Sequence, residues 1–194
     1  MISHLRNVLR KSPYLTSVGL YTILYTGADV CNQLWNFHFN EKVTHQQATF
    51  SLDLGRTARM GVIGFACLGN FNYVWIPFLE RMFPGATVRK TLAKVLVDQV
   101  IAAPLLITAF YAGLRVLERK PDVFAVVREK FVDTYVTGMM FWPAAQTINF
   151  YLLPLQYRVI FLGVCSFTWA NVMCFMKARA ELEMLDTEAG NKQD

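Results

Sequence analysis

The feature that most constrains this chain is a set of five long stretches without a single Asp, Glu, Lys or Arg. They cover residues 12–28, 60–79, 99–114, 134–157 and 159–176. A helix needs about 20 mostly apolar residues to cross the hydrocarbon core of a bilayer, with a range of about 17 to 25. One such stretch could equally be the core helix of a soluble protein, but five in 194 residues leave too little polar surface to cover a soluble core. The composition agrees, because only 17% of the residues are charged, against about 25% in soluble proteins.

We therefore predict an all-α fold, a multi-pass transmembrane helix bundle that forms one integral membrane domain over residues 1–194. The spans are expected near residues 13–35, 58–79, 92–114, 134–153 and 157–176. The last two stretches abut around Pro154 and Arg158 with almost no loop, so the count stays open between four and five spans. Residues 177–194 are acidic and are expected to form a loose tail.

Local signals refine these boundaries. Pro13 suits the first turn of a helix. Thr44 and Gln47 form a capping box, which predicts that the second helix begins there. Apolar residues at helical spacing, opposite a charged face, predict an amphipathic helix on the membrane surface before the fourth span; they are Phe124, Val127, Phe131 and Tyr135.

Charge and motif content exclude several classes of function. The net charge is +5, but Lys and Arg are spread over the ends of the apolar stretches, where they meet lipid headgroups. A protein that binds nucleic acid would gather them in a dense patch. The cysteines and histidines have no metal-ligand spacing, and the sequence has no phosphate-binding or catalytic motif. We therefore expect no metal, no cofactor, no enzymatic activity and no direct binding of nucleic acid.

Polar side chains inside the apolar stretches are the candidate functional residues. Gln146 and Asn149 lie three residues apart and face the same side of a helix, where lipid could not satisfy their amides. The same argument applies to other spans, and we expect seven residues to converge inside the bundle: Asp29, Gln33, Lys94, Asp98, Gln99, Gln146 and Asn149. Either they hydrogen-bond one another and hold the helices together, a role called interhelical glue below, or they line a water-filled path for a small solute.

Two charged pairs leave alternatives open. Lys94 and Asp98 are four residues apart on one helical face. Lys94 either extends to the membrane interface or pairs with Asp98 in a polar interior. Asp53 and Arg56 are three residues apart and form either a solvated ion pair or part of a functional site.

These residues resemble a known signature. The segment WPAAQTINFYLLPLQYR (residues 142–158), followed by Trp169, matches W-P-x-x-Q-x-x-N-F with a later Pro, Arg and Trp, the signature of the Mpv-seventeen / peroxisomal membrane protein family. The chain also resembles the family's K-x-x-x-D-Q, its short charged helix and the D-x-x-x-Q of its first span. The matching residues outside the polar set are Asp53, Arg56, Arg59, Pro104, Trp142, Pro143, Phe150, Pro154, Arg158 and Trp169.

The resemblance covers roughly residues 13–176 and is strongest to the Mpv-seventeen-like branch. It departs from other branches in the second span, which reads ACLGNFNYVWIPFLER. It implies a protein of the mitochondrial inner or peroxisomal membrane without known catalytic activity. Family members are linked to small-solute conductance, reactive-oxygen metabolism and upkeep of mitochondrial DNA.

Two functions follow from the residues and the resemblance together. The first is a small-solute pore or permeability regulator that influences the redox state of its organelle. The alternative is a non-conducting membrane scaffold that recruits or restrains partner proteins. The candidate partners are the lipid bilayer, small solutes or metabolites, and a second copy of the chain.

Overall fold

The computed structural model describes residues 12–44 and 50–190, which form five long helical rods. The first rod is α2 (Pro13–Thr44), and the last two are α7 (Ala125–Leu152) and α8 (Leu155–Gly190). The second rod joins α3 (Leu54–Ile63), a π-helical stretch η1 (Gly64–Gly69) and α4 (Asn70–Met82). The third joins α5 (Val88–Val97), a second π-helical stretch η2 (Asp98–Ala102) and α6 (Ala103–Leu117). No strand occurs in the described ranges, and the predicted all-α class is confirmed.

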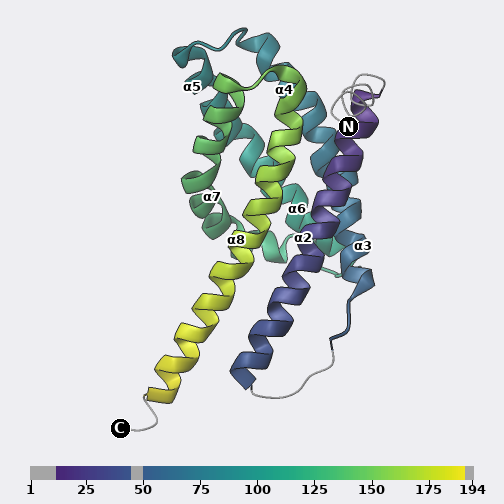
Figure 1. Ribbon diagram of the computed structural model, residues 1–194, viewed down its shortest axis with the longest axis vertical. Coiled ribbons are helices and arrows are strands. Elements are labelled where there is room, and N and C mark those ends of the chain that lie inside the picture. The colour runs from purple at the N-terminus through teal and green to yellow at the C-terminus, as the bar shows by residue number, and fades with distance from the viewer. Residues whose placement is uncertain (1–11, 45–49, 191–194) are drawn as a thin grey trace, which may run out of the picture.

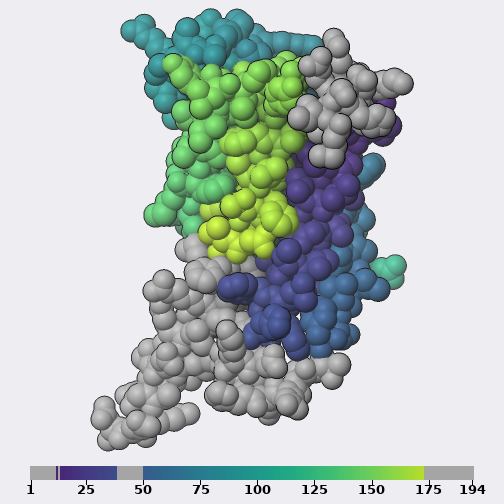
Figure 2. Space-filling view, in the orientation of Figure 1, coloured from purple at the N-terminus to yellow at the C-terminus, as the bar shows by residue number. Residues whose placement is uncertain are grey.

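The rods run alternately up and down, so that each is antiparallel to the next (Figure 1). α8 lies between α7 and α2 and contacts both, and these three helices form one face of the molecule (Figure 2). Behind that face, α3 and η1 pack against α2, and α6 packs against α7. The α4–α5 and α7–α8 turns therefore lie at the same end of the bundle (Figure 1).

Two of the rods, Leu54–Met82 and Val88–Leu117, are long and apolar enough to cross a membrane by length and composition. Within Val88–Leu117, only 6% of the most apolar 18-residue segment is buried within the molecule. Its exposed side chains include Val100 and Leu105. An apolar helix with so little protein cover would present a large hydrophobic surface to water, so its environment fits lipid better.

The expected start of the second helix is wrong. The first helix continues to Thr44, and the rest of the predicted capping box lies within residues 45–49, outside the described ranges. The described helix α3 begins at Leu54, and its N-cap is Asp53, whose carboxylate accepts a hydrogen bond from the backbone N–H of Arg56 at 2.8 Å. An aspartate is among the strongest N-caps, which explains why the helix begins at this point.

The helices extend through the segments expected as a surface helix and a tail. Residues 125–152 form one continuous helix, because no Gly or Pro separates the amphipathic segment from the apolar stretch. α8 continues to Gly190 where a loose tail from residue 177 was expected, while residues 191–194 lie outside the described ranges.

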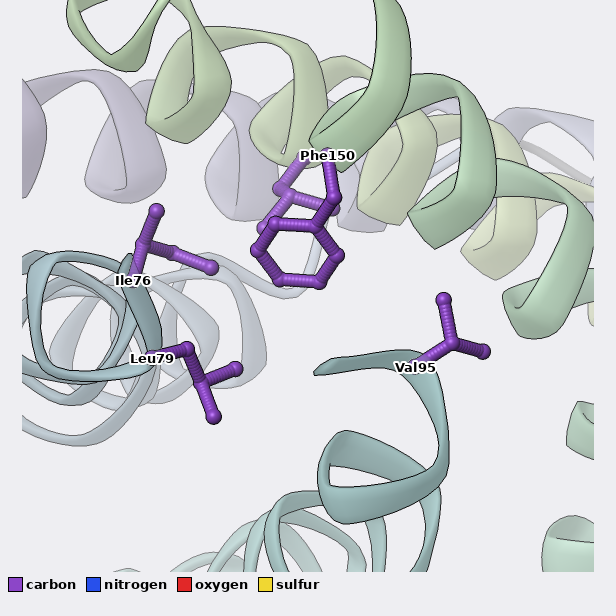
Figure 3. Packing of buried hydrophobic residues seen from close by; sticks show 5 residues of the cluster. Ile76, Leu79, Val95 and Phe150 are labelled. Carbon is purple, nitrogen blue, oxygen red and sulfur yellow. The ribbon is translucent and has the colours of Figure 1, made fainter. Parts of the chain in front are cut away.

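One buried cluster joins four helices at the end of the bundle that carries the α4–α5 turn. It consists of Ile76, Leu79, Val95, Phe150 and Leu162. Figure 3 shows the ring of Phe150 between two side chains of α4 and one of α5. Phe150 is fully buried, so this aromatic residue of the signature is a packing centre.

A second buried cluster joins α2 to the second rod through Tyr21, Ile63 and Leu68. The helices approach closely because residue 64 is a glycine. A Cβ atom at Gly64 would lie 2.7 Å from the carbonyl oxygen of Tyr21, so any side chain would push the two rods apart.

Candidate functional site

The seven polar residues predicted to converge are divided among three clusters. The central cluster consists of Trp75, Asp98, Gln99, Gln146 and Asn149, and the end triad consists of Glu80, Lys94 and Arg158. The α2–α3 cluster consists of Asp29, Gln33, Asp53, Arg56 and Thr57. The end triad lies by the α4–α5 and α7–α8 turns, and the α2–α3 cluster lies toward the opposite end, where α3 begins (Figure 1).

Asp98 is the hub of the central cluster. Its Oδ1 accepts a hydrogen bond from Trp75 Nε1 at 2.9 Å, and its Oδ2 accepts one from Gln146 Nε2 at 2.9 Å. Gln99 Nε2 also donates to Oδ2, at 3.2 Å. These donors come from three rods, so one carboxylate ties α4, η2 and α7 together. All three donors are neutral, and no cation pairs with Asp98 among the described residues.

The π-helical stretch η2 explains how two successive side chains reach the interior. Asp98 and Gln99 are both buried, although adjacent residues of a regular helix point about 100° apart. π-helical turns inside α-helices are rare and occur frequently at functional sites. The Tyr135 hydroxyl donates to the carbonyl oxygen of Gln99 at 3.1 Å and so holds this turn against α7.

The two amides of the signature form a short chain behind Asp98. Asn149 Nδ2 donates to Gln146 Oε1 at 3.1 Å, while Gln146 uses its own N–H groups toward Asp98. Asn149 is fully buried, and its Oδ1 has no hydrogen-bond partner in the described residues. The amides thus support the carboxylate and leave one buried acceptor unsatisfied.

The end triad brings two cations to one carboxylate oxygen. Lys94 Nζ and Arg158 Nη1 each lie 2.5 Å from Oε2 of Glu80. The other oxygen of Glu80 accepts the backbone N–H of Gly85, a turn residue with a φ of +96°. Lys94 and Arg158 are both buried, whereas Glu80 is partly exposed.

The proposed pairing of Lys94 with Asp98 is therefore wrong, while the alternative that Lys94 extends to the membrane interface stays a prediction. Its side chain has no exposed surface, and its ammonium bonds Glu80 and the carbonyl oxygen of Gly85, at 3.0 Å. The antiparallel turn between α4 and α5 places Glu80 at the level of Lys94, and this partner from another helix prevails over the partner four residues away.

Arg158 also explains the end of the signature. Its Nε and Nη2 donate to the carbonyl oxygens of Leu153 and Phe150, which are left without helical partners where α7 ends. Pro154 makes the turn and cannot continue the helix. Lys94 and Arg158 both lie over the ring of Phe150, with each cation 5.6 Å from the ring centroid.

The α2–α3 cluster is built around Asp29. Arg56 Nε donates to Asp29 Oδ1 at 2.7 Å, and Gln33 Nε2 donates to Oδ2 at 2.7 Å. Thr57 Oγ1 lies 2.7 Å from the same Oδ2. The alternative of an Asp53–Arg56 ion pair is wrong, because Asp53 caps the helix and the Arg56 guanidinium reaches α2 instead.

The remaining signature residues lie outside the three polar clusters. The rings of Trp142 and Trp169 lie 6.2 Å apart and join α7 to α8. Pro143 lies inside α7, and Pro104 lies in the first turn of α6. Arg59 is partly buried in α3. Within the described residues, no group of His, Cys, Asp and Glu could hold a metal ion.

Sequence reasoning missed Glu80, Trp75 and Thr57 as members of these clusters. Glu80 could have been found, because a Pro-Gly turn separates it from Lys94 and places the two residues at one level of adjacent antiparallel helices. Trp75 gave no such signal, since a tryptophan near the end of a span usually marks the membrane interface.

Comparisons with known proteins agree with the signature. A profile described as the Mpv17 / PMP22 family matches residues 115–174. An Mpv17-like protein of Xenopus laevis is 39% identical over 170 residues, which are 88% of this chain and 79% of the relative. An Mpv17-like protein of Bos taurus is 36% identical over 169 residues, 87% of this chain and 80% of the relative.

A more distant relative extends the likeness to another branch. The mitochondrial inner membrane protein Mpv17 of Caenorhabditis briggsae is 31% identical over 147 residues, 75% of this chain and 80% of the relative. No solved structure matches the chain. The identity to the two Mpv17-like relatives extends over 88% and 87% of the sequence, and the chain belongs to the Mpv17 / PMP22 family.

Proposed function

We propose that this protein lies in the mitochondrial inner or peroxisomal membrane as a bundle of at least four spans and conducts small solutes along its polar interior. Relatives named mitochondrial inner membrane protein Mpv17 support the location. An uncharged stretch in every rod supports the count of spans, because each is close to the length that crosses a bilayer.

The observation that carries the proposal is the carboxylate of Asp98, which is buried and solvated only by neutral donors. A charge at the centre of a membrane helix costs at least about 2.5 to 3.5 kcal/mol on insertion scales. If the cluster were only interhelical glue, an asparagine could accept from Trp75 without that cost. Ionisable residues inside a membrane commonly mark a path for ions or solutes.

The amides fit the same function. Gln146 and the unsatisfied Oδ1 of Asn149 lie beside the carboxylate and offer oxygen acceptors to a passing cation or polar solute. The three clusters follow one another between the two ends of the bundle, and the ion-paired clusters lie on either side of the central one. Under this proposal the present arrangement is the closed state, and opening requires the ion-paired ends to separate.

Conduction of small solutes would link the protein to organelle redox state. Permeability sets the rate at which reduced and oxidised metabolites cross the membrane, and with it the supply of reductant that removes reactive oxygen species. This link depends on conduction and adds no separate site to the molecule.

Recording from purified protein in planar bilayers tests the proposal. Wild-type protein should conduct, and Asp98→Asn should lower its preference for cations, measured as a smaller reversal potential in a salt gradient. Asp122→Asn is the matched control, because this carboxylate is exposed before α7 and should not change selectivity. If folded wild-type protein passes no current over a range of voltages, the proposal of conduction is refuted and the non-conducting membrane scaffold remains as the function.

A second variant separates a solute path from glue. Gln146→Leu combined with Asn149→Leu removes both amides at similar bulk. A conducting interior should then lose conductance while the fold survives, because apolar constrictions expel water. If the amides are glue alone, thermal stability should fall and any conductance should keep its character.

A further inference from the structure

We propose that the end triad is a binding site for a phosphate group, in which Lys94 and Arg158 hold the ligand and Glu80 is a tethered carboxylate that the ligand displaces. The inference does not depend on conduction by the bundle. It assigns a ligand class to a cluster that the proposed solute path uses only as one of its closed ends.

The first argument is charge. Lys94 and Arg158 carry two positive charges, and Glu80 carries one negative charge. Burying a charge is costly unless it is paired. The next carboxylate along the rod, that of Asp98, bonds neutral donors and neither of these cations. The triad therefore carries an uncompensated positive charge and favours an anion.

The second argument is the number of unused donors. A lysine ammonium has three N–H groups and an arginine guanidinium has five. Lys94 donates to two acceptors, and Arg158 donates to three. One N–H of the ammonium and one on each terminal nitrogen of the guanidinium are thus left without a protein acceptor among the described residues, although both side chains are buried.

These unused donors favour phosphate over a second carboxylate. Oε2 of Glu80 already accepts from both cations and Oε1 accepts the N–H of Gly85, so three of the roughly four acceptor sites of this carboxylate are in use. A phosphate group has at least two further oxygens, and the planar fork of arginine beside a lysine ammonium is a common arrangement for binding phosphate.

Access and depth fit a ligand that enters from the end of the bundle. The side chain of Glu80 is 24% exposed, against 0% for Lys94 and 6% for Arg158. Glu80 lies in the last turn of α4, so its side chain can rotate outward without disturbing the helix. The ring of Phe150 closes the inner side, and the negative charge of Asp98 one turn farther along repels an anion from the interior.

Two sources could supply the phosphate group, a soluble phosphate compound or the headgroup of a phospholipid at the membrane surface. Full-length protein in a neutral maltoside detergent distinguishes them. Inorganic phosphate is compared with chloride at equal ionic strength, and short-chain phosphatidic acid is compared with diacylglycerol of the same chains. The measured quantities are the thermal midpoint and the ligand concentration at half saturation.

We expect phosphate or phosphatidic acid to raise the thermal midpoint above that of its matched control. Glu80→Gln removes the competing carboxylate and should lower the half-saturating concentration at least tenfold. Arg128→Gln removes a cation of an exposed ion pair at the other end of α7 and should leave the response unchanged. A response to soluble phosphate identifies a free ligand, and a response to phosphatidic acid alone identifies a headgroup.

A binding measurement on wild-type protein keeps the proposal falsifiable if Glu80→Gln does not fold. Native mass spectrometry should detect bound phosphate or phosphatidic acid on wild-type protein, and Arg158→Lys should reduce it at least fivefold, because an ammonium lacks the planar fork. Wild-type protein that binds neither probe more than its matched control would overturn the proposal.

Discussion

The charge count of the end triad leads to an asymmetric prediction. Glu80→Gln removes the shared counter-ion and leaves two buried cations, whereas Lys94→Met removes the excess cation and leaves a balanced Glu80–Arg158 pair. We therefore expect Glu80→Gln to destabilise the protein far more than Lys94→Met, although each substitution breaks the same Lys94–Glu80 contact.

The magnitudes separate the two variants clearly. Breaking a buried ion pair by removing one partner costs about 3 to 5 kcal/mol, because the remaining charge is left uncompensated. For Lys94→Met, the lost charged hydrogen bond to Glu80, of about 1.5 to 3 kcal/mol, is offset by removing a lysine whose burial costs up to about 2.5 to 3.5 kcal/mol. The second acceptor of Lys94, the carbonyl oxygen of Gly85, lies in an exposed turn and can bond water instead. The net change for Lys94→Met should stay within about 1 kcal/mol.

Thermal unfolding in detergent, in a chloride buffer without phosphate, measures the difference. For a chain of this length, 1 kcal/mol corresponds to about 2 to 4 °C in Tm. Glu80→Gln should therefore lower Tm by roughly 10 °C or more, and Lys94→Met by less than about 4 °C. Glu129→Gln, on the exposed side of α7, is the control and should not shift Tm measurably. The reasoning is refuted if Lys94→Met lowers Tm as much as Glu80→Gln does.

Two further predictions concern other parts of the molecule. Gln146→Leu should lower the free energy of unfolding by about 1 to 3 kcal/mol, because it removes the interhelical bond to Asp98 and leaves the buried amide of Asn149 without its acceptor. Thr147→Val, on the exposed side of the same helix, should lower it by less than about 0.5 kcal/mol. A denaturant titration that finds the two losses equal would contradict this prediction. The hydrogen bond from Arg128 holds the pKa of Asp122 below its ordinary value of 3.8, so the stability that Asp122 contributes is present above that value and is lost as pH falls through its lower folded-state pKa. An NMR titration should show this low pKa, and Arg128→Gln should raise it; a pKa for Asp122 that the substitution leaves unchanged would count against the ion pair.

The helical class and the positions of the rods could be predicted, because they depend on local signals. Uncharged stretches mark the rods, and the burial of Gln146 and Asn149 follows from the cost of exposing an amide to lipid. The second, third and fifth rods exceed the expected spans at both ends, and the first and fourth at one end, because helices do not stop where hydrophobicity stops. They stop at caps such as Asp53 or at breakers such as Pro154.

The partners of the polar residues could not be predicted, because they depend on which helices are neighbours. Lys94 has a possible partner four residues away in the sequence, yet it bonds Glu80 across a turn. Asp98 receives a hydrogen bond from Trp75, which the sequence alone assigns to the membrane interface. Spacing within one helix says which residues share a face, but only the packing of the rods says what that face meets.

α4 therefore determines which partners the two buried charged groups of α5 and η2 bind. Lys94 and Asp98 carry opposite charges one helical turn apart, an arrangement that normally favours pairing. α4 supplies both groups that keep them separate, since Glu80 bonds the ammonium and Trp75 bonds the carboxylate. The buried negative charge of the central cluster and the positive excess of the end triad both depend on this one helix. A displacement of α4 would therefore take the carboxylate partner from Lys94 and one of the three donors from Asp98 at the same time. A displacement of α7 alone would leave Lys94 on Glu80.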